Sequence, residues 1–223
     1  MALIPCLLAT GIAHAQQSLF NVPSSEITEK DHWFFQEQLN LGRSGVSNTT
    51  FDYGLGHEWE VGFNLFDVDV YHPADEEPAA TLPLFNLQKR FELRPGLALG
   101  IGAQIGAMSP GSHQDIRLAN LDYINCPIQL GHWGTGFVGG YFANAAYTAS
   151  RPGAGFMLGA DIPIMEKKLH FMADYMHGTT AVGVGVVGFV LYLPKGWQIS
   201  AGAQLPAPGS HNDYGLVLEF THL

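Results

Sequence analysis

Charge is the first property that this sequence has little of. Only 13% of its 223 residues are Asp, Glu, Lys or Arg, whereas about 25% is usual for soluble domains. Lys and Arg number 10 against 20 Asp and Glu, which gives a formal net charge of −10. Because nucleic-acid binding needs a basic surface, this acidic balance argues against a nucleic-acid partner.

Cysteine is also scarce, with only Cys6 and Cys126 in the chain. Cys6 lies in an apolar N-terminal segment that ends in Ala13-His14-Ala15, the A-x-A cleavage pattern of a secretory signal. The signal is incomplete, since no Lys or Arg precedes its apolar core. We expect a signal peptide over residues 1–15. Its removal would leave Cys126 alone and exclude an intramolecular disulfide.

Long hydrophobic runs are absent as well. No window approaches the 18 or so consecutive apolar residues that indicate a transmembrane helix. The apolar stretch AVGVGVVGFVLYLP at 181–194 contains three glycines, each of which costs a helix roughly 1 kcal/mol. Read with a period of two, it alternates as a β-strand does, with a phase slip between Val186 and Val187. We expect a β-bulge there, which would turn Val182 and Val184 outward; without it these valines face inward.

Alternation of bulky apolar residues with small or polar ones recurs along the chain. Twelve segments carry a bulky apolar face opposite a small or polar one, at 32–42, 49–66 (two segments), 84–93, 97–107, 113–125, 133–148, 154–164, 168–176, 181–194, 197–205 and 213–223. Short turns are expected at 56–57, 94–96, 165–167 and 194–196. Longer connections are expected at 43–48, 71–80, 108–112, 149–153, 177–180 and 206–212, and one more at 126–132 interrupts this rhythm.

The polar faces of these segments favour a membrane barrel over a soluble sandwich. They consist mainly of Gly, Asn, Gln and Ser, and they carry few of the lysines that protect soluble edge strands. Closing the sheet into a barrel removes its edges. Aromatic residues suit the membrane interface, and they stand at the ends of the segments as Trp33, Trp59, Trp133, Tyr175, Trp197 and Tyr214. We therefore predict an all-β, closed antiparallel transmembrane β-barrel at 32–223. It has about 12 strands, with 10 as the alternative count, short periplasmic turns and longer outer loops. Residues 16–31 precede it as a leader or a plug.

The hairpin YGLGHEWEVGFNL at 53–65 resembles hairpins of Gram-negative outer-membrane barrels, in particular small transporters of the meta-pathway phenol-degradation type. The resemblance implies a bacterial outer-membrane protein, surrounded by lipid and acting as a narrow channel or transporter for small solutes. The chain ends in EFTHL, so it departs from the terminal aromatic residue that such barrels usually carry. We expect it to be a monomer.

If the bulky faces point outward, the polar residues of the other faces line the lumen. The candidates are Asp52, Glu58, Glu60, Asn64, Gln88, Arg90, Glu92, Asp161, His170, Asp174, Gln198 and Glu219. Two interpretations stay open: a packed polar network that fills the lumen, or a water-filled path whose acids favour cations or neutral polar solutes. We expect the narrow path, because many inward glycines leave space.

The sequence gives little support for catalysis or for a bound metal or cofactor. Ser112, His113 and Asp115, and Ser210, His211 and Asp213, could suggest a hydrolase acting on lipid or ester, but neighbours on an extended chain point in opposite directions. We therefore assign no catalytic residue and favour a protein that is not an enzyme. The ten histidines lack metal-ligand spacing, so we expect no metal and no cofactor. The hydrolase stays an alternative, as does a structural or surface-interaction barrel that acts through loops 71–80 and 206–212.

Overall fold

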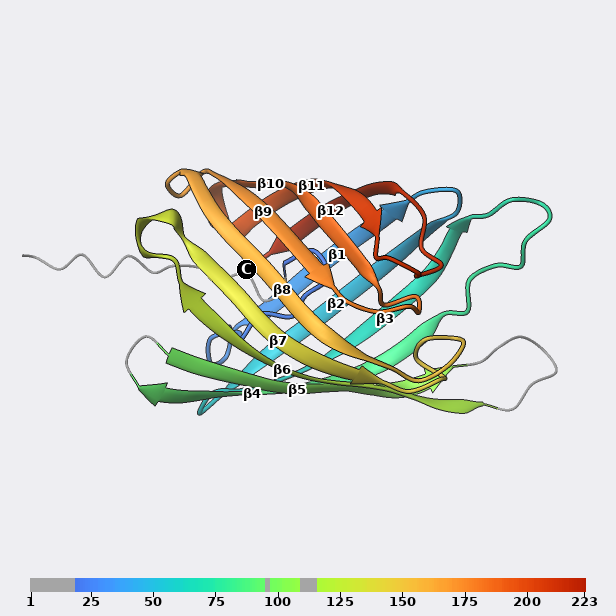
Figure 1. Ribbon diagram of the computed structural model, residues 1–223. Helices are drawn as coiled ribbons and strands as arrows, with labels where there is room; N and C mark the ends of the chain where they lie inside the picture. The colour runs from blue at the N-terminus through green and yellow to red at the C-terminus, as the bar shows by residue number, and fades with distance from the viewer. Residues whose placement is uncertain (1–18, 95–96, 109–115) are drawn as a thin grey trace, which may run out of the picture.

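Twelve antiparallel strands close into one barrel in the computed structural model, which describes residues 19–94, 97–108 and 116–223 (Figure 1). Each strand pairs with its neighbours in sequence, and β1 pairs with β12 to complete the ring. The prediction of a closed 12-stranded antiparallel barrel is confirmed. The strands are β1 (Trp33–Leu41), β2 (Gly45–Gly56), β3 (Trp59–Tyr71), β4 (Leu82–Arg94), β5 (Leu97–Met108), β6 (Arg117–Gln129), β7 (Thr135–Ala143), β8 (Gly153–Met165), β9 (Leu169–Met176), β10 (Val184–Tyr192), β11 (Trp197–Pro206) and β12 (Gly215–His222).

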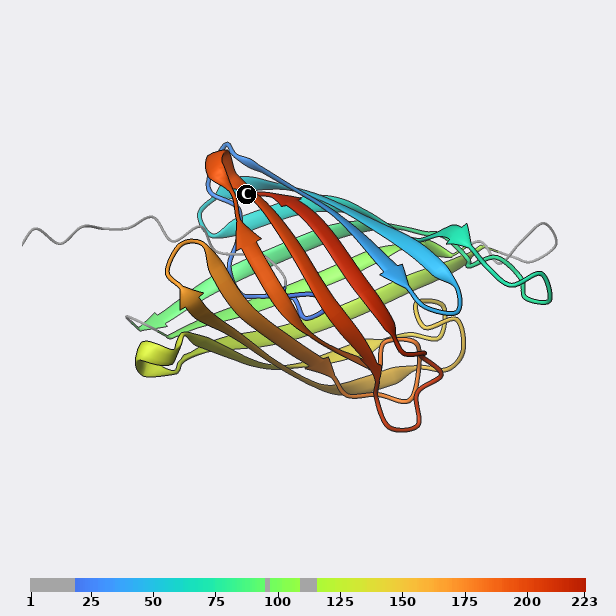
Figure 2. The same cartoon turned by 90° about the horizontal axis from the view of Figure 1, so that it is seen from above.

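The two ends of the barrel differ in their connections. One end, here the turn end, holds the short connections 57–58, 130–134, 166–168 and 193–196, together with the start of β1 and the end of β12. The other, the loop end, holds the connections 42–44, 72–81, 144–152, 177–183 and 207–214. The strands are tilted relative to the barrel axis (Figure 2), as closure of a sheet requires. The described residues include no helix long and apolar enough to cross a membrane.

Three predicted connections are wrong. The one expected at 149–153 spans 144–152, because β7 ends at Ala143. The interruption expected at 126–132 does not exist, because β6 continues to Gln129 and pairs there with Thr135; only the short turn 130–134 follows, with the 3-10 helix η1 (Gly131–Trp133). The first outer connection shrinks from 43–48 to 42–44. Polar residues predicted a connection as far as residue 48, yet the hydroxyls of Ser47 and Thr49 bind Glu37 at 2.5 and 2.6 Å on the neighbouring strand.

The expected β-bulge in β10 is also wrong. The strand pairs with β9 and β11 in continuous register from Val184 to Leu191. Val184 and Val186 are therefore buried inside the barrel, while Val187 is 40% exposed on its outside. Bulky apolar groups can face inward here, because apolar side chains of residues 19–22 lie inside the lumen and pack in one cluster with Val186.

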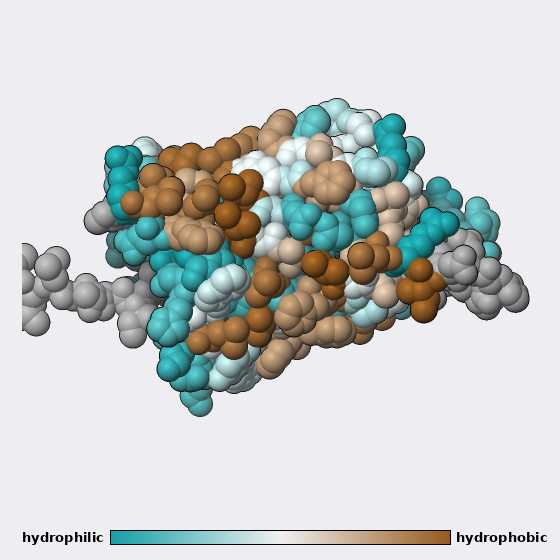
Figure 3. All heavy atoms as spheres, turned by 90° about the horizontal axis from the view of Figure 1, so that it is seen from below, coloured by the Kyte–Doolittle hydropathy of each residue, from teal (hydrophilic) through white to brown (hydrophobic). Residues whose placement is uncertain are grey.

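The wall has its apolar side outward and most of its polar side inward. Large hydrophobic residues cover the outside, as Figure 3 shows for one face, where a hydrophilic patch interrupts them. Phe189 is 52% exposed outside, whereas Gln198 and Asn64 are fully buried inside. Outward polar groups have partners nearby: Asn120 Nδ2 donates to Asp122 Oδ2 at 2.7 Å. Such a distribution is the reverse of that of a soluble domain.

Candidate functional site

The lumen contains an N-terminal segment, residues 19–32, which we call the strap (Figures 1 and 2). It reaches the turn end at the start of β1 and carries side chains that are almost completely buried. Phe20 is 2% exposed, Val22 1% and Ser24 0%. The strap pairs little of its own main chain: Leu19 N donates to the Val22 carbonyl at 3.0 Å and His32 N to the Glu29 carbonyl at 3.1 Å. Its other N–H and C=O groups need partners from the barrel wall.

Asp174 on β9 binds the deepest part of the strap. Its Oδ2 accepts hydrogen bonds from the main-chain nitrogens of Asn21 and of Val22, the latter at 2.9 Å. On the opposite side, Gln38 of β1 donates to the carbonyl of Phe20 at 2.9 Å when its amide nitrogen faces the lumen. A carboxylate, which can only accept, thus binds two N–H groups, while an amide nitrogen, which can only donate, binds a carbonyl.

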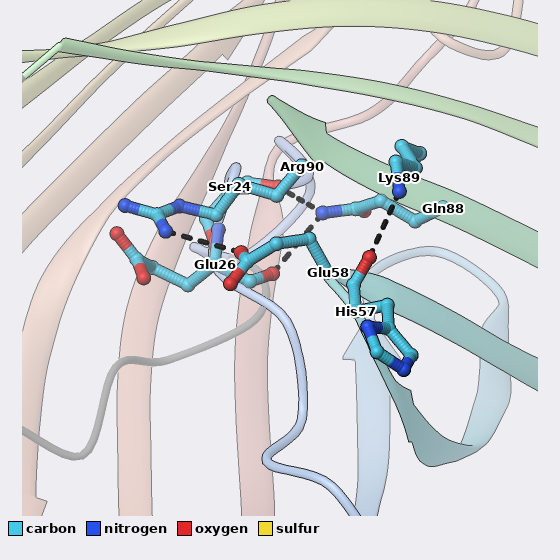
Figure 4. Close-up of polar contacts among 7 residues, drawn as sticks. All are labelled: Ser24, Glu26, His57, Glu58, Gln88, Lys89 and Arg90. Atoms are coloured by element: carbon cyan, nitrogen blue, oxygen red, sulfur yellow. Dashed lines mark hydrogen bonds and ion pairs between the residues drawn. The ribbon is translucent and has the colours of Figure 1, made fainter. Parts of the chain in front are cut away.

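Two amides bind the middle of the strap. Gln88 of β4 points inward and its Nε2 donates to the carbonyls of Ser24 and Glu26, both at 3.1 Å (Figure 4). Asn125 of β6 donates to the carbonyl of Pro23 at 2.7 Å. The hydroxyl of Tyr123 donates to Gln88 Oε1 at 2.5 Å, which fixes the orientation of the Gln88 amide and turns its nitrogen toward the strap.

The strap is bound to β2 and β3 near the turn end. Glu60 Oε2 accepts from the main-chain nitrogen of Thr28 at 2.6 Å and from its hydroxyl at 2.7 Å. Lys30 then forms a parallel bridge with Gly54, whose carbonyl also accepts from the nitrogen of Asp31 at 3.0 Å. A Cβ at Gly54 would lie 2.1 Å from the carbonyl oxygen of Glu29, so glycine is what allows this close approach.

Apolar packing complements these hydrogen bonds. Leu19, Phe20 and Val22 form one buried cluster with wall residues that include Val186, Val190, Val217, Met157 and Met172. Two glycines make room for it: a Cβ at Gly159 would lie 2.0 Å from Leu19 Cδ1, and one at Gly202 would lie 3.0 Å from Phe20 Cζ. Each buried side chain of this kind contributes about 1.5–3 kcal/mol.

A cavity of about 370 Å³ lies between the strap and the loop end. Phe20, Asn21 and Pro23 of the strap contribute to its lining, together with residues of the connections 42–44 and 207–214. Among the described residues, its lining holds four carboxylates, those of Asp52, Glu60, Asp67 and Asp213, and Arg43 as the one Lys or Arg. Arg43 is itself paired with Glu76 at 2.8 Å and Asp75 at 3.8 Å.

Amides bridge the acids of the cavity. Asn86 Nδ2 donates to Asp52 Oδ1 at 3.1 Å and to Asn64 Oδ1 at 2.7 Å, and Asn64 Nδ2 donates to Asn86 Oδ1 at 2.9 Å. At the loop end, the Tyr147 hydroxyl donates to Gln104 Oε1 at 2.8 Å. Burial, and then the negative charge of Asp67, raise the pKa of Tyr147, so this phenol stays protonated.

The structure separates the twelve lumen candidates into several places. Asp52, Glu60, Asn64 and Gln88 line the cavity, and Asp174 binds the strap. Glu219 accepts from Gln36 Nε2 at 2.8 Å, and it is buried on the inner wall like Gln198.

The other five lumen candidates do not line the cavity. Arg90 binds Glu58 at 3.1 Å near the turn end (Figure 4), and His170 Nδ1 contacts Asp161 Oδ1 at 2.7 Å. Glu92 is exposed.

Several residues of the lumen were not predicted, among them Asn125, Tyr123, Asp67 and Tyr147. Leu121, Tyr123 and Asn125 all face inward, so the period-two signal was present; the segment was hard to interpret because Asp122 occupies an outward position. Asp67 has a φ of 56° next to a register shift between β2 and β3, which no alternation pattern reveals. Tyr147 enters the lumen from a connection rather than from a strand.

The described residues support neither the hydrolase alternative nor a metal site. Ser112, His113 and Asp115 lie outside the part of the chain that the structure describes. Ser210 Oγ is buried and has no hydrogen-bond partner among the described residues, so His211 does not activate it there. Within the same residues, no group of three or more His, Cys, Asp or Glu could hold a metal ion.

No family model matches the chain, and the search of curated proteins gives no match. The geometry of the lumen is therefore what carries a functional conclusion.

Proposed function

We propose that the chain is an outer-membrane β-barrel that forms a narrow channel for small solutes. The observation that carries the proposal is the acidic cavity that extends from the loop end to the strap inside a closed barrel. A polar space enclosed by a wall with an apolar exterior is the arrangement of a membrane pore.

The exterior supports a membrane location. In lipid every main-chain group must be paired within the protein, which a closed barrel achieves. Large apolar side chains such as Phe63, Phe85 and Phe189 are 51–53% exposed on the outside, where water would make them costly. Lys89 lies near the turn end, where its Nζ binds the His57 carbonyl at 2.8 Å (Figure 4). The same Nζ lies 4.7 Å from the centroid of the Trp59 ring. By the usual topology, the turn end faces the periplasm.

The charges of the cavity favour cations and neutral polar solutes. Asp52, Glu60, Asp67 and Asp213 line the cavity, and the guanidinium of Arg43 is already paired with two loop acids. A path lined by one sign of charge raises the local concentration of the opposite ion. Anions would therefore be excluded from the part of the lumen above the strap.

The first test is the ion selectivity of the purified protein in planar bilayers. With a salt gradient, we expect a reversal potential that shows a preference for K⁺ over Cl⁻. Asp213→Asn should shift it toward zero, because a carboxylate at the loop end of the cavity lining loses its charge. Glu77→Gln, in the same loop as Asp75 and outside the cavity lining, is the matched control. A folded, inserted barrel without conductance under any condition would remove the channel and leave the barrel.

The second test concerns the strap, which closes the turn end and must move for solutes to pass. A Cβ at Gly100 would lie 3.0 Å from the Cβ of Ser25, 2.9 Å from its Cα and 2.5 Å from Asn125 Oδ1. The Cβ–Cβ spacing is about half an ångström below the usual disulfide range, so a cross-link forms with a small shift of the strap and of the Asn125 side chain. The pair Ser25→Cys and Gly100→Cys, with Cys6 and Cys126 replaced by Ser and Ala, should therefore tie the strap to β5. We expect oxidation to abolish conductance and a reductant to restore it. Equal conductance in both states would show that the strap does not control the path.

A further inference from the structure

The barrel wall recognises the strap chiefly through its main chain. Between Phe20 and Asp31, atoms of the wall bind the carbonyls of Phe20, Pro23, Ser24 and Glu26 and the nitrogens of Asn21, Val22, Thr28 and Asp31. Most of the partners are side chains from β1, β3, β4, β6 and β9, so they converge from around the ring rather than from one edge.

The chemistry of these partners matches a peptide and no simpler ligand. Asp174 and Glu60 can only accept when ionised, and they meet N–H groups. Gln88 and Asn125 present amide nitrogens, and they meet C=O groups. A metal ion would use the acids alone and an anion the amides alone, whereas a peptide main chain uses both in turn. We propose that the inner wall around the strap is a binding site for the main chain of an unfolded peptide, occupied in cis by the strap.

An apolar subsite favours apolar residues at the N-terminal end of such a peptide. The strap places Leu19, Phe20 and Val22 in a cluster formed by Val186, Val190 and neighbouring methionines. Gly159 and Gly202 leave the space that these side chains fill. The site therefore takes a peptide that begins with a short apolar group and continues with residues whose order matters little, because the wall contacts their main chain. Binding of this kind requires no conduction, so the proposal goes beyond the channel function.

The experiment uses a barrel without residues 19–31, purified in detergent, and fluorescent synthetic peptides followed by anisotropy. The first peptide is LFNVPSSEITEKD, the sequence of residues 19–31. A second keeps LFNV and the threonine that corresponds to Thr28, whose hydroxyl binds Glu60 at 2.7 Å, and rearranges the remaining residues. A third is the first peptide with N-methyl groups on the nitrogens that correspond to Val22 and Thr28, which removes two hydrogen bonds to carboxylates while all side chains stay in place. We expect the first two to bind within about threefold of each other and the third to bind at least tenfold more weakly.

A full-length variant covers the case in which the barrel without the strap does not fold. Leu19→Ala and Phe20→Ala loosen the strap but leave every wall residue in place, so the first peptide should compete with it. The same variant with Ser25→Cys and Gly100→Cys is the matched control, which should bind the peptide when reduced and lose at least tenfold in affinity when oxidised.

Three results would overturn the proposal: equal binding of the N-methylated peptide, equal binding to the oxidised and reduced controls, or no binding to a strapless barrel shown to be folded by its gel mobility. Each is separable from failure of the channel. Peptide binding without conductance removes the channel alone, and conductance without peptide binding removes the peptide site alone.

Discussion

At the scale of single residues, the interior depends on glycines that permit close approaches. Gly188 in β10 is an example: a Cβ there would lie 2.1 Å from the carbonyl oxygen of Ala201 and 2.5 Å from the Cα of Gly202. Both atoms belong to the main chain of β11 and cannot rotate away. Gly140 in β7 is different, since its Cβ would meet only the Gly155 carbonyl oxygen at 3.5 Å.

Gly188→Ala should therefore destabilise the barrel by about 1–3 kcal/mol, the usual cost of overpacking, whereas Gly140→Ala should be close to neutral. The measurement is a urea titration of the refolded protein in lipid vesicles, with the folded fraction followed by heat-modifiable gel mobility. A Gly188→Ala midpoint equal to that of Gly140→Ala would mean that the two strands separate easily.

At the scale of elements, the turn between β2 and β3 carries local strain. Its two residues, His57 and Glu58, have φ values of 53° and 63°, as a type I′ hairpin turn requires. Neither is glycine or asparagine, the residues that tolerate this region. The His57 side chain plays no part in the bond that its carbonyl accepts from Lys89, so position 57 can change without the loss of that contact.

His57→Asn should raise the free energy of unfolding by about 0.5–1 kcal/mol, a fraction of the strain of a left-handed residue. His57→Val, which places a β-branched side chain in the same conformation, should lower it. The same urea titration compares the two, and the reverse order of midpoints would contradict the assignment of the turn.

β10 shows how one element presents opposite faces to two environments. Val186 is fully buried and packs in the cluster around the strap, whereas the adjacent Val187 is 40% exposed on the outer wall. Sequence alone left their directions open, because the run of valines and glycines permits two phases. The continuous pairing with β9 and β11 chooses one of them, and the strap explains why apolar residues are acceptable inside.

At the scale of the whole molecule, the central question is whether the outer wall faces lipid. Val187→Arg places a cation near the middle of β10 and should cost about 2–4 kcal/mol in a bilayer. Val187→Leu is the matched control and should be neutral. Insertion into vesicles, scored by gel mobility, tests this pair; a fully folded, water-soluble Val187→Arg protein would exclude a lipid-facing wall.

The sequence by itself determined the barrel, because alternation is a local property that each strand carries within its own residues. Asn64, Gln88 and Asp174 could all be assigned to inward faces in this way. Only the tertiary structure decided what they do there. Val22 binds Asp174 across 152 residues, and Pro23 binds Asn125 across 102, contacts that exist only once the sheet has closed around the strap. The strap has no periodicity of its own to predict its path, and the phase of β10 depends on neighbours in the ring. Local pattern therefore specified the wall, while closure specified the contents of the lumen.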